Sequence, residues 1–132
     1  MSVRAPHTSQ IRKVGQVAIN VHDLDRAVRF YRDVLGLEFL FQVPKLAFFN
    51  CGGVRLMLGA AESARFDHPA SILYYDVPDI QAATDILKEL GAAFESDPHV
   101  IADLGDRVLW IAFLADSEGN PVALMSEVPK GA

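Results

Sequence analysis

The feature of this chain that most restricts its fold is an internal repeat. The tetrapeptide VHDL at residues 21–24 recurs in altered form as VPDI at residues 77–80. A strand-like run of apolar residues precedes each copy, and an apolar pattern with helical spacing follows it. A chain that repeats one supersecondary unit in this way is expected to fold as two similar modules that pack together.

The spacing of apolar residues predicts the same order of elements in both halves. Strands are expected over residues 14–21 and 71–77. Each is followed by a helix whose first amides can be capped by Asp23 or Asp79, and which a glycine, Gly36 or Gly91, terminates. Further strands are expected at 37–43, 46–50 and 54–58 in the first half and at 93–95, 108–115 and 121–128 in the second. Each half therefore reads strand, helix, strand, strand, strand.

We predict a single α+β domain over residues 14–128, made of two repeats, 14–59 and 71–128, that residues 60–70 join. Each repeat would bury its helix against one face of its sheet and leave the other face free. Residues 1–13 contain no apolar run, so we expect a flexible tail and neither a signal peptide nor a membrane anchor.

Charge and composition exclude several partners. The formal net charge is −5, and the 12 Lys and Arg residues are scattered, whereas nucleic-acid binding needs a basic face. No stretch approaches the roughly 20 apolar residues that cross a bilayer. The one cysteine, Cys51, cannot form an internal disulfide, which fits the reducing cytoplasm as the expected location.

Several short motifs stand in a specific order and spacing along the chain. They are 17–24 (VAINVHDL), Ala27, 30–31 (FY), 35–37 (LGL), the stretch 98–110, 112–113 (AF), the turn 116–121 (DSEGNP) and 124–127 (LMSE). Together they resemble the vicinal oxygen chelate superfamily, which includes glyoxalases, bleomycin-resistance proteins and extradiol dioxygenases. The resemblance extends from about residue 14 to residue 127. It implies two βαβββ modules that form a curved eight-stranded mixed sheet around a cavity, commonly in a homodimer.

The resemblance also implies a place for a metal, since catalytic members hold a divalent ion in the cavity with His or carboxylate ligands. Their four ligand positions fall on Gln16, Met57, Ile72 and Ala123. Some glyoxalase I proteins use glutamine at the first position, but a thioether is a poor ligand for such ions and the last two side chains cannot ligate. We therefore expect no divalent metal cofactor, which disfavours the familiar metal-dependent enzymes.

Strand alternation selects the side chains that would line the cavity instead. They are mostly apolar, with a few polar groups and one cation, and suit an amphipathic or aromatic molecule bearing an anionic or carbonyl group. Arg55 could bind a carboxylate or face solvent, and the two methionines could merely fill core gaps. Trp110 could stack on a planar ligand or be buried in the core or a dimer interface. The expected lining is Gln16, Asn20, Arg55, Met57, Ile72, Tyr74, Ala123, Met125 and Glu127.

Two functions stay open, and we favour the first. It is a metal-free protein that binds a small molecule in the cavities of a homodimer. The second is an enzyme (a lactoylglutathione-lyase-like lyase, an isomerase or a dioxygenase) with a displaced metal site or metal-free acid–base chemistry. His99, Glu127 and Tyr74 are its candidate catalytic residues, although the first two could equally be surface residues. Related sequences tend to carry histidine where Arg107 stands, which weakens any paired-histidine site. His7, His22 and His68 are assigned no role.

Overall fold

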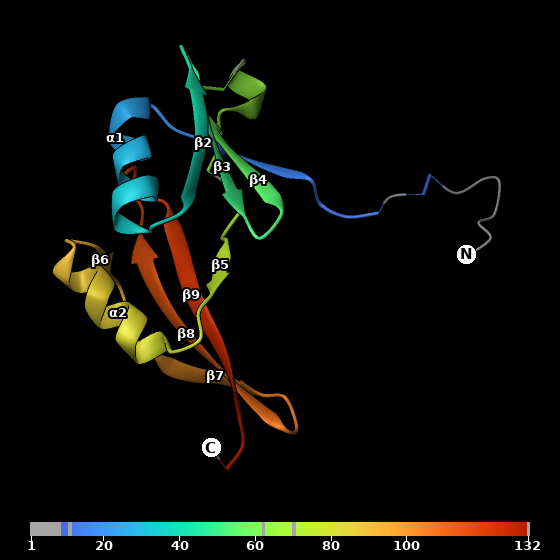
Figure 1. Ribbon diagram of the computed structural model, residues 1–132, viewed down its shortest axis with the longest axis vertical. Coiled ribbons are helices and arrows are strands. Elements are labelled where there is room, and N and C mark those ends of the chain that lie inside the picture. Colours follow the sequence, from blue (N-terminus) through green and yellow to red (C-terminus); the bar gives the residue numbers. More distant parts are fainter. Residues whose placement is uncertain (1–8, 11, 62, 70, 132) are drawn as a thin grey trace.

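The computed structural model describes residues 9–10, 12–61, 63–69 and 71–131. It contains two modules, each with a sheet and a helix, and the two helices lie on the same side of the molecule (Figure 1). Most of the predicted tail, residues 1–8 and 11, lies outside the described residues. Among the described residues, no helix is long and apolar enough to cross a membrane.

The first module follows the predicted order of elements. Its four strands form one sheet in the order β1-β4-β3-β2, with β1 parallel to β4 and the other neighbours antiparallel. The elements are β1 (Gln16–Asn20), α1 (Leu24–Arg29), a π-helical turn η1 (Phe30–Val34), β2 (Glu38–Val43), β3 (Leu46–Cys51) and β4 (Val54–Gly59).

The second module repeats this pattern after a short 3₁₀ turn. Its sheet has the order β5-β9-β8-β6, and β7 also pairs with β8. Here too the first strand, β5, runs parallel to the last, β9. The elements are η2 (Ala64–Phe66), β5 (Tyr74–Asp76), α2 (Ile80–Glu89), β6 (Ala93–Phe94), β7 (His99–Asp103), β8 (Arg107–Ala115) and β9 (Pro121–Pro129).

Both helices begin and end where the sequence predicts a cap or a stop. The carboxylates of Asp23 and Asp79 each accept a hydrogen bond of 3.1 Å, from the backbone N–H of Arg26 and of Ala82 respectively. Gly36 and Gly91 follow the helical segments with φ of +75° and +94°, a conformation that side chains other than glycine's disfavour.

The expected α+β fold with two similar modules is confirmed, and the structure adds one strand. Residues 99–103, which the sequence left irregular, form β7. β6 and β7 pair in succession with the same strand, β8, so together they fill one strand position. They are interrupted at residues 95–98, where Pro98 has no N–H to donate to a ladder. The eight strand positions form two hydrogen-bonded sheets of four, one in each module.

The hydrophobic core consists of two clusters, one between each helix and its sheet. Tyr31, Phe49 and Leu58 are fully buried in the first, and Leu114 is fully buried in the second. Phe30, Leu35 and Tyr75 pack against both clusters and so join the modules. The helices thus cover one face of each sheet, and the opposite faces are left free.

Candidate functional site

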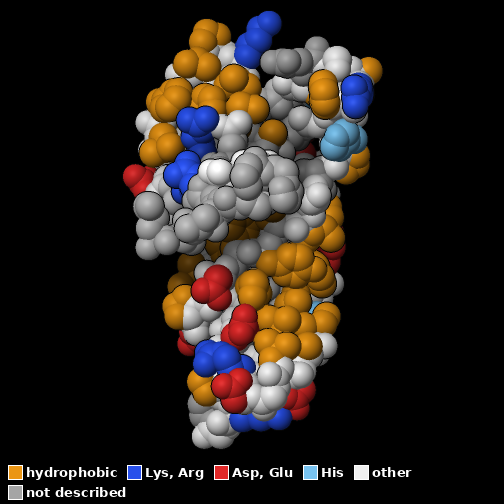
Figure 2. Space-filling model, turned by 90° about the vertical axis from the view of Figure 1, so that its right-hand side faces the viewer, with side chains coloured by type: hydrophobic (Ala, Val, Ile, Leu, Met, Phe, Trp, Pro, Cys, Tyr) orange, Lys and Arg blue, Asp and Glu red, His pale blue; other side chains and the backbone are white. Residues whose placement is uncertain are grey.

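The candidate site lies on the faces of the two sheets that point away from the helices. On β1, Ile19 is buried in the core, whereas Gln16 and Ala18 are exposed on the free face. On β4, Leu56 is buried while Arg55 is exposed. Figure 2, which views the side opposite the helices, shows hydrophobic side chains gathered over both modules and basic side chains among those of the upper one.

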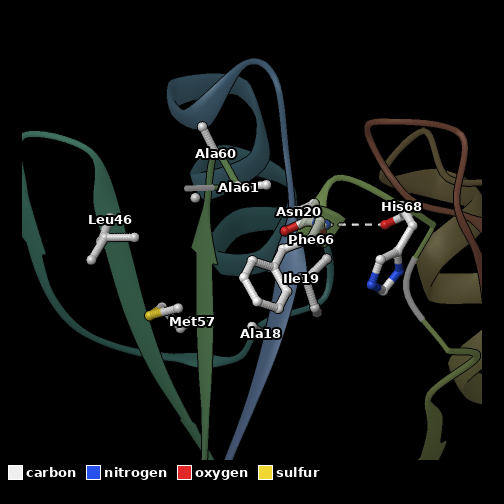
Figure 3. A pocket seen from close by; sticks show the side chains of 10 residues that line it. Ala18, Ile19, Asn20, Leu46, Met57, Ala60, Ala61, Phe66 and His68 are labelled. Carbon is white, nitrogen blue, oxygen red and sulfur yellow. Dashed lines mark hydrogen bonds between the residues drawn. The ribbon is translucent and has the colours of Figure 1, made fainter. Parts of the chain in front are cut away.

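Residues 60–70 form the connector between the two modules. A cavity of about 300 Å³ opens where the described part of the connector, residues 60–61 and 63–69, passes over the free face of the first sheet (Figure 3). Residues 62 and 70 of this connector lie outside the described part of the chain. The Asn20 amide donates to the backbone carbonyls of Phe66 and of His68, the latter at 3.1 Å, and so holds the connector above the sheet. The cavity is lined by Ala18, Ile19, Asn20, Leu46, Met57 and Gly59 from the sheet and by Ala60, Ala61, Phe66 and His68 from the connector.

Next to this cavity, a row of side chains fixes the orientation of Arg55. Its Nε donates a 2.6 Å hydrogen bond to Oε1 of Gln16, and its guanidinium carbon lies 5.1 Å from the centroid of the Phe48 ring. Phe48 in turn stacks on Phe41 with ring centroids 4.6 Å apart. The Gln16 amide nitrogen lies 3.7 Å from the sulfur of Met57, which connects this row to the cavity floor.

The free face of the second sheet carries most of the other predicted site residues. Tyr74 is in register with Ala123, and its ring meets Phe113 edge-on at 6.1 Å. Met125 and Glu127 follow Ala123 on the same face of β9, since alternate residues of a strand share a face. His99 is in register with Ile111, which pairs with Met125. Ile72 precedes β5 and is 42% exposed.

The three candidate acid–base residues lie on this face, but no hydrogen bond or ion pair of the described residues joins any two of them. Nδ1 of His99 lies 2.8 Å from the backbone carbonyl of Asp97. Oε1 of Glu127 lies 3.9 Å from Nε of Arg107, which is a long distance for an ion pair. His99 and Glu127 belong to strands on opposite sides of β8, so roughly 10 Å separates the two strands. A direct histidine–carboxylate dyad is not formed here.

Trp110 does not belong to the free face with the other predicted lining residues. It pairs with Ser126 across β8 and β9, and the side chains of that pair lie on the helix side. There Trp110 packs against the core cluster beneath α2. The reason is the alternation of β8: Ile111 and Leu109 face the free side, so the residue between them faces the helix.

The residues at the four expected metal positions do not fit a divalent ion. Gln16 and Met57 lie together on the first sheet, and Ala123 donates its N–H to the carbonyl of Leu73, next to Ile72. The one nitrogen or oxygen side chain among the four is the Gln16 amide, whose oxygen already accepts from Arg55. Elsewhere in the described ranges, no group of three His, Cys, Asp or Glu residues is arranged to hold a metal.

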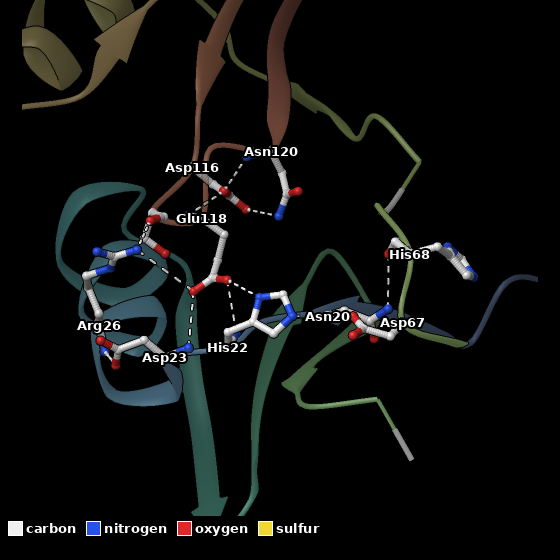
Figure 4. A network of polar contacts seen from close by, with 10 residues as sticks. Asn20, His22, Asp23, Arg26, Asp67, His68, Asp116, Glu118 and Asn120 are labelled. Carbon is white, nitrogen blue, oxygen red and sulfur yellow. Dashed lines mark hydrogen bonds and ion pairs between the residues drawn. The ribbon is translucent and has the colours of Figure 1, made fainter. Parts of the chain in front are cut away.

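A polar junction between the modules, which we define as His22, Asp67, Asp116 and Glu118, was missed at the sequence level (Figure 4). Glu118, in the turn between β8 and β9, accepts from the backbone N–H of His22 at 2.9 Å and of Asp23 at 3.2 Å. The His22 ring lies between two carboxylates, with Nδ1 3.1 Å from Glu118 and Nε2 3.4 Å from Asp67.

These contacts set the charge of the junction. Burial acts to raise the pKa of Glu118, but the hydrogen bonds from His22 and Asp23 outweigh it and hold that pKa below its ordinary value. The hydrogen bonds to Glu118 and Asp67 raise the pKa of His22. Both partners are therefore charged over a wider pH range than they would be alone.

Asp116 is the buried part of the junction. It is 6% exposed and accepts from the Tyr31 hydroxyl at 2.8 Å and from the backbone N–H groups of Glu118 and Asn120 at 2.9 and 2.8 Å. The Tyr31 contact joins η1 of the first module to the turn of the second, while the two backbone contacts lie within the turn itself. The acidic composition of that turn was visible in the sequence, but its partners lie 85 or more positions away.

Comparisons with known proteins agree on one kind of fold. A family model described as "Glyoxalase/Bleomycin resistance protein/Dioxygenase superfamily" matches residues 13–124. A lactoylglutathione lyase from Agrobacterium tumefaciens superposes with a TM-score of 0.71 at 26% identity, covering 86% of this chain and 92% of that one. A glyoxalase/bleomycin resistance protein/dioxygenase from Alicyclobacillus acidocaldarius gives 0.68 at 19% identity, with 95% of both chains covered, and shows similarity of fold alone.

Similarity to curated relatives is more local. The metallothiol transferase FosB of Staphylococcus haemolyticus is 33% identical over 48 residues, which are 36% of this chain and 34% of the relative. The match therefore spans about a third of that protein's length.

Proposed function

The chain belongs to the glyoxalase/bleomycin resistance protein/dioxygenase superfamily, and on that premise we propose that it binds a small amphipathic or aromatic molecule without a divalent metal. The observation that carries the proposal is the cavity between the connector and the first sheet, with Met57 and Ala18 in its floor. Apolar lining with a few oriented polar groups is the usual composition of a small-molecule site.

The residues at the family's metal positions support the metal-free part of the proposal. Met57, Ile72 and Ala123 offer no nitrogen or oxygen ligand, and the Gln16 oxygen is bonded to Arg55. Gln16, Asn20, Arg55 and Met57 would instead shape the ligand site of the first sheet. The second sheet would supply further ligand contacts from its free face, through Ile72, Tyr74, Ala123, Met125 and Glu127.

We further propose that the protein acts as a homodimer. Large hydrophobic side chains on the free faces are exposed in the single chain, with Phe41 at 46% and Tyr74 at 45%. A second copy placed against these faces would remove that apolar surface from water, which is favourable at about 25 cal/mol per Å². Light scattering coupled to size-exclusion chromatography gives the mass that tests this. We place the protein in the cytoplasm, where its unpaired Cys51 would stay reduced.

The alternative function is a metal-free acid–base enzyme that uses His99, Glu127 and Tyr74. All three share the free face of the second sheet, which is what favours it. The separation of His99 from Glu127 across β8 weighs against direct cooperation of the two, because a general base must lie within hydrogen-bond reach of the proton it takes. Trp110, on the helix side, would support the sheet rather than stack on a ligand.

Fluorescence titration with Nile red, a neutral apolar dye, tests the proposed site on the full chain in the presence of a chelator. We expect saturable binding that Ala18→Trp abolishes, because Ala18 is exposed on the free face and lines the cavity. Ala82→Trp, on the exposed surface of α2, is the matched control and should bind like the wild type. No binding by the wild type, or equal loss in both variants, would contradict the proposal.

A further inference from the structure

We infer that the ligand is a small organic monocarboxylate, whose carboxylate is bound by Arg55 and whose apolar body lies over Ala18 and Met57 toward Phe66. This inference rests on the proposed function and names the chemical class of its ligand. Its starting point is the charge of Arg55. In the ranges that the structure describes, no carboxylate lies within ion-pair distance of this guanidinium.

The cross-strand neighbours of Arg55 are polar but leave its charge uncompensated. Its cross-strand partners are Gln16 on β1 and Asn50 on β3. Glu38 on β2 is the acidic residue of the same row, two strands away. Its carboxylate accepts a 3.0 Å hydrogen bond from Asn50. A carboxylate from a ligand would therefore be the first anion to contact Arg55.

The guanidinium is also oriented before any ligand arrives. Gln16 fixes its Nε, and the Phe48 ring packs against it. Neither terminal nitrogen has a hydrogen bond to a described residue. An arginine whose two terminal nitrogens are free and whose orientation is fixed is well suited to bind a carboxylate, because a carboxylate can accept two parallel hydrogen bonds.

The geometry of β4 sets the size of the ligand. Arg55, Met57 and Gly59 succeed one another on one face, and each step of two residues is about 6.7 Å. A carboxylate at Arg55 would place an aromatic ring on a short chain over Met57 and Ala18, with its far end in the cavity below Phe66. One guanidinium matches one negative charge, and the net charge of −5 disfavours polyanions such as phosphate esters.

Calorimetry with a matched pair of ligands tests the inference: 3-phenylpropionate and its neutral analogue 3-phenylpropanamide. We expect the wild type to bind the carboxylate at least about tenfold more tightly than the amide, as a charge-assisted bidentate contact implies. Arg55→Gln should remove this preference. Gln16→Leu should reduce it without any change in net charge, because it removes the acceptor that orients Arg55.

Arg29→Gln is the matched control, since Arg29 lies exposed on α1 and its loss changes the net charge by the same amount. It should keep the wild-type preference. Equal affinity for the two ligands, or no binding of either by a protein that still binds Nile red, would overturn the carboxylate inference and leave the proposed function intact. A preference that survives Arg55→Gln would overturn the role of Arg55. Absence of all binding, Nile red included, would refute the proposed function and the inference together.

Discussion

Removal of a single hydroxyl tests whether the polar junction holds the two modules together. Tyr31→Phe deletes the donor of the 2.8 Å hydrogen bond to Asp116 and nothing else. Tyr31 is fully buried, and burial together with the Asp116 carboxylate raises the pKa of its hydroxyl. The hydroxyl therefore stays protonated and can donate throughout the working pH range.

The expected cost follows from the environment of Asp116. A hydrogen bond to a charged group contributes about 1.5–3 kcal/mol. In the variant, Oδ2 of Asp116 keeps a 3.2 Å hydrogen bond from the Asn120 amide, and Oδ1 keeps its two backbone donors. The carboxylate therefore still has hydrogen-bond partners, and the cost stays within this range. The unfolding entropy is about 2.1 cal/mol/K per residue, and the chain has 132 residues. Dividing the lost free energy by this entropy gives an expected fall in Tm of about 5–11 °C.

The matched control is the same chemical change at Tyr75, whose buried hydroxyl has no hydrogen-bond partner among the described residues. Tyr75→Phe should lower the free energy of unfolding by no more than about 0.5 kcal/mol, because it removes no hydrogen bond and an unpaired buried polar group is itself unfavourable. Thermal and urea unfolding of both variants at one protein concentration supply the comparison. If Tyr75→Phe costs as much as Tyr31→Phe, or if neither changes stability, the reasoning about the junction is refuted.

Three further perturbations test other parts of the structure. The raised pKa of His22 gives stability that is present below its ordinary pKa of 6.5 and is lost as pH rises through the raised value. The lowered pKa of Glu118 gives stability that is present above its ordinary pKa of 4.5 and is lost as pH falls through the lowered value. The difference in Tm between wild type and His22→Gln should therefore be largest between about pH 4.5 and 6.5, and a difference independent of pH from 4 to 9 would be inconsistent with this pair. Asn20→Ala removes both hydrogen bonds to the connector, so limited proteolysis should cleave residues 63–69 several-fold faster than in the wild type, whereas an unchanged cleavage rate would show that Asn20 does not hold it. Gly59→Ala should destabilise the fold by about 1–3 kcal/mol, because a Cβ there would lie 2.8 Å from the carbonyl oxygen of Lys45 and 2.4 Å from the Leu46 side chain; a urea midpoint equal to that of the wild type would contradict this.

The repeat made much of the fold accessible from the sequence because its signals are local. Asp23 and Asp79 cap helices through residues three positions away, and the alternation of β1 and β4 depends only on neighbouring residues. Periodicity therefore predicts that Arg55 shares a face with Met57, while the resemblance to the family indicates which face of each sheet is turned to the cavity.

What the sequence did not reveal depends on contacts between distant segments. Glu118 meets His22 across 96 positions, and no periodicity records how one module docks on the other. The connector has no strong pattern of its own, so its place over Asn20 could not be foreseen. Trp110 was considered for its chemistry, whereas its face is set by the alternation of β8, in which its neighbours Leu109 and Ile111 pair with the free-face residues Glu127 and Met125. β7 was missed because Pro98 interrupts the strand position that it shares with β6.

The central claim is that this member of the superfamily binds its ligand without a divalent ion. The affinity of the protein for metal ions tests this claim most directly. Protein purified without chelators is analysed for its elements, and nickel, zinc, manganese and iron(II) are then titrated into the full chain by calorimetry. We predict far less than one ion per chain and no saturable heat. Tight stoichiometric uptake of any of these ions that is lost in Gln16→Ala or Glu127→Ala would contradict the account.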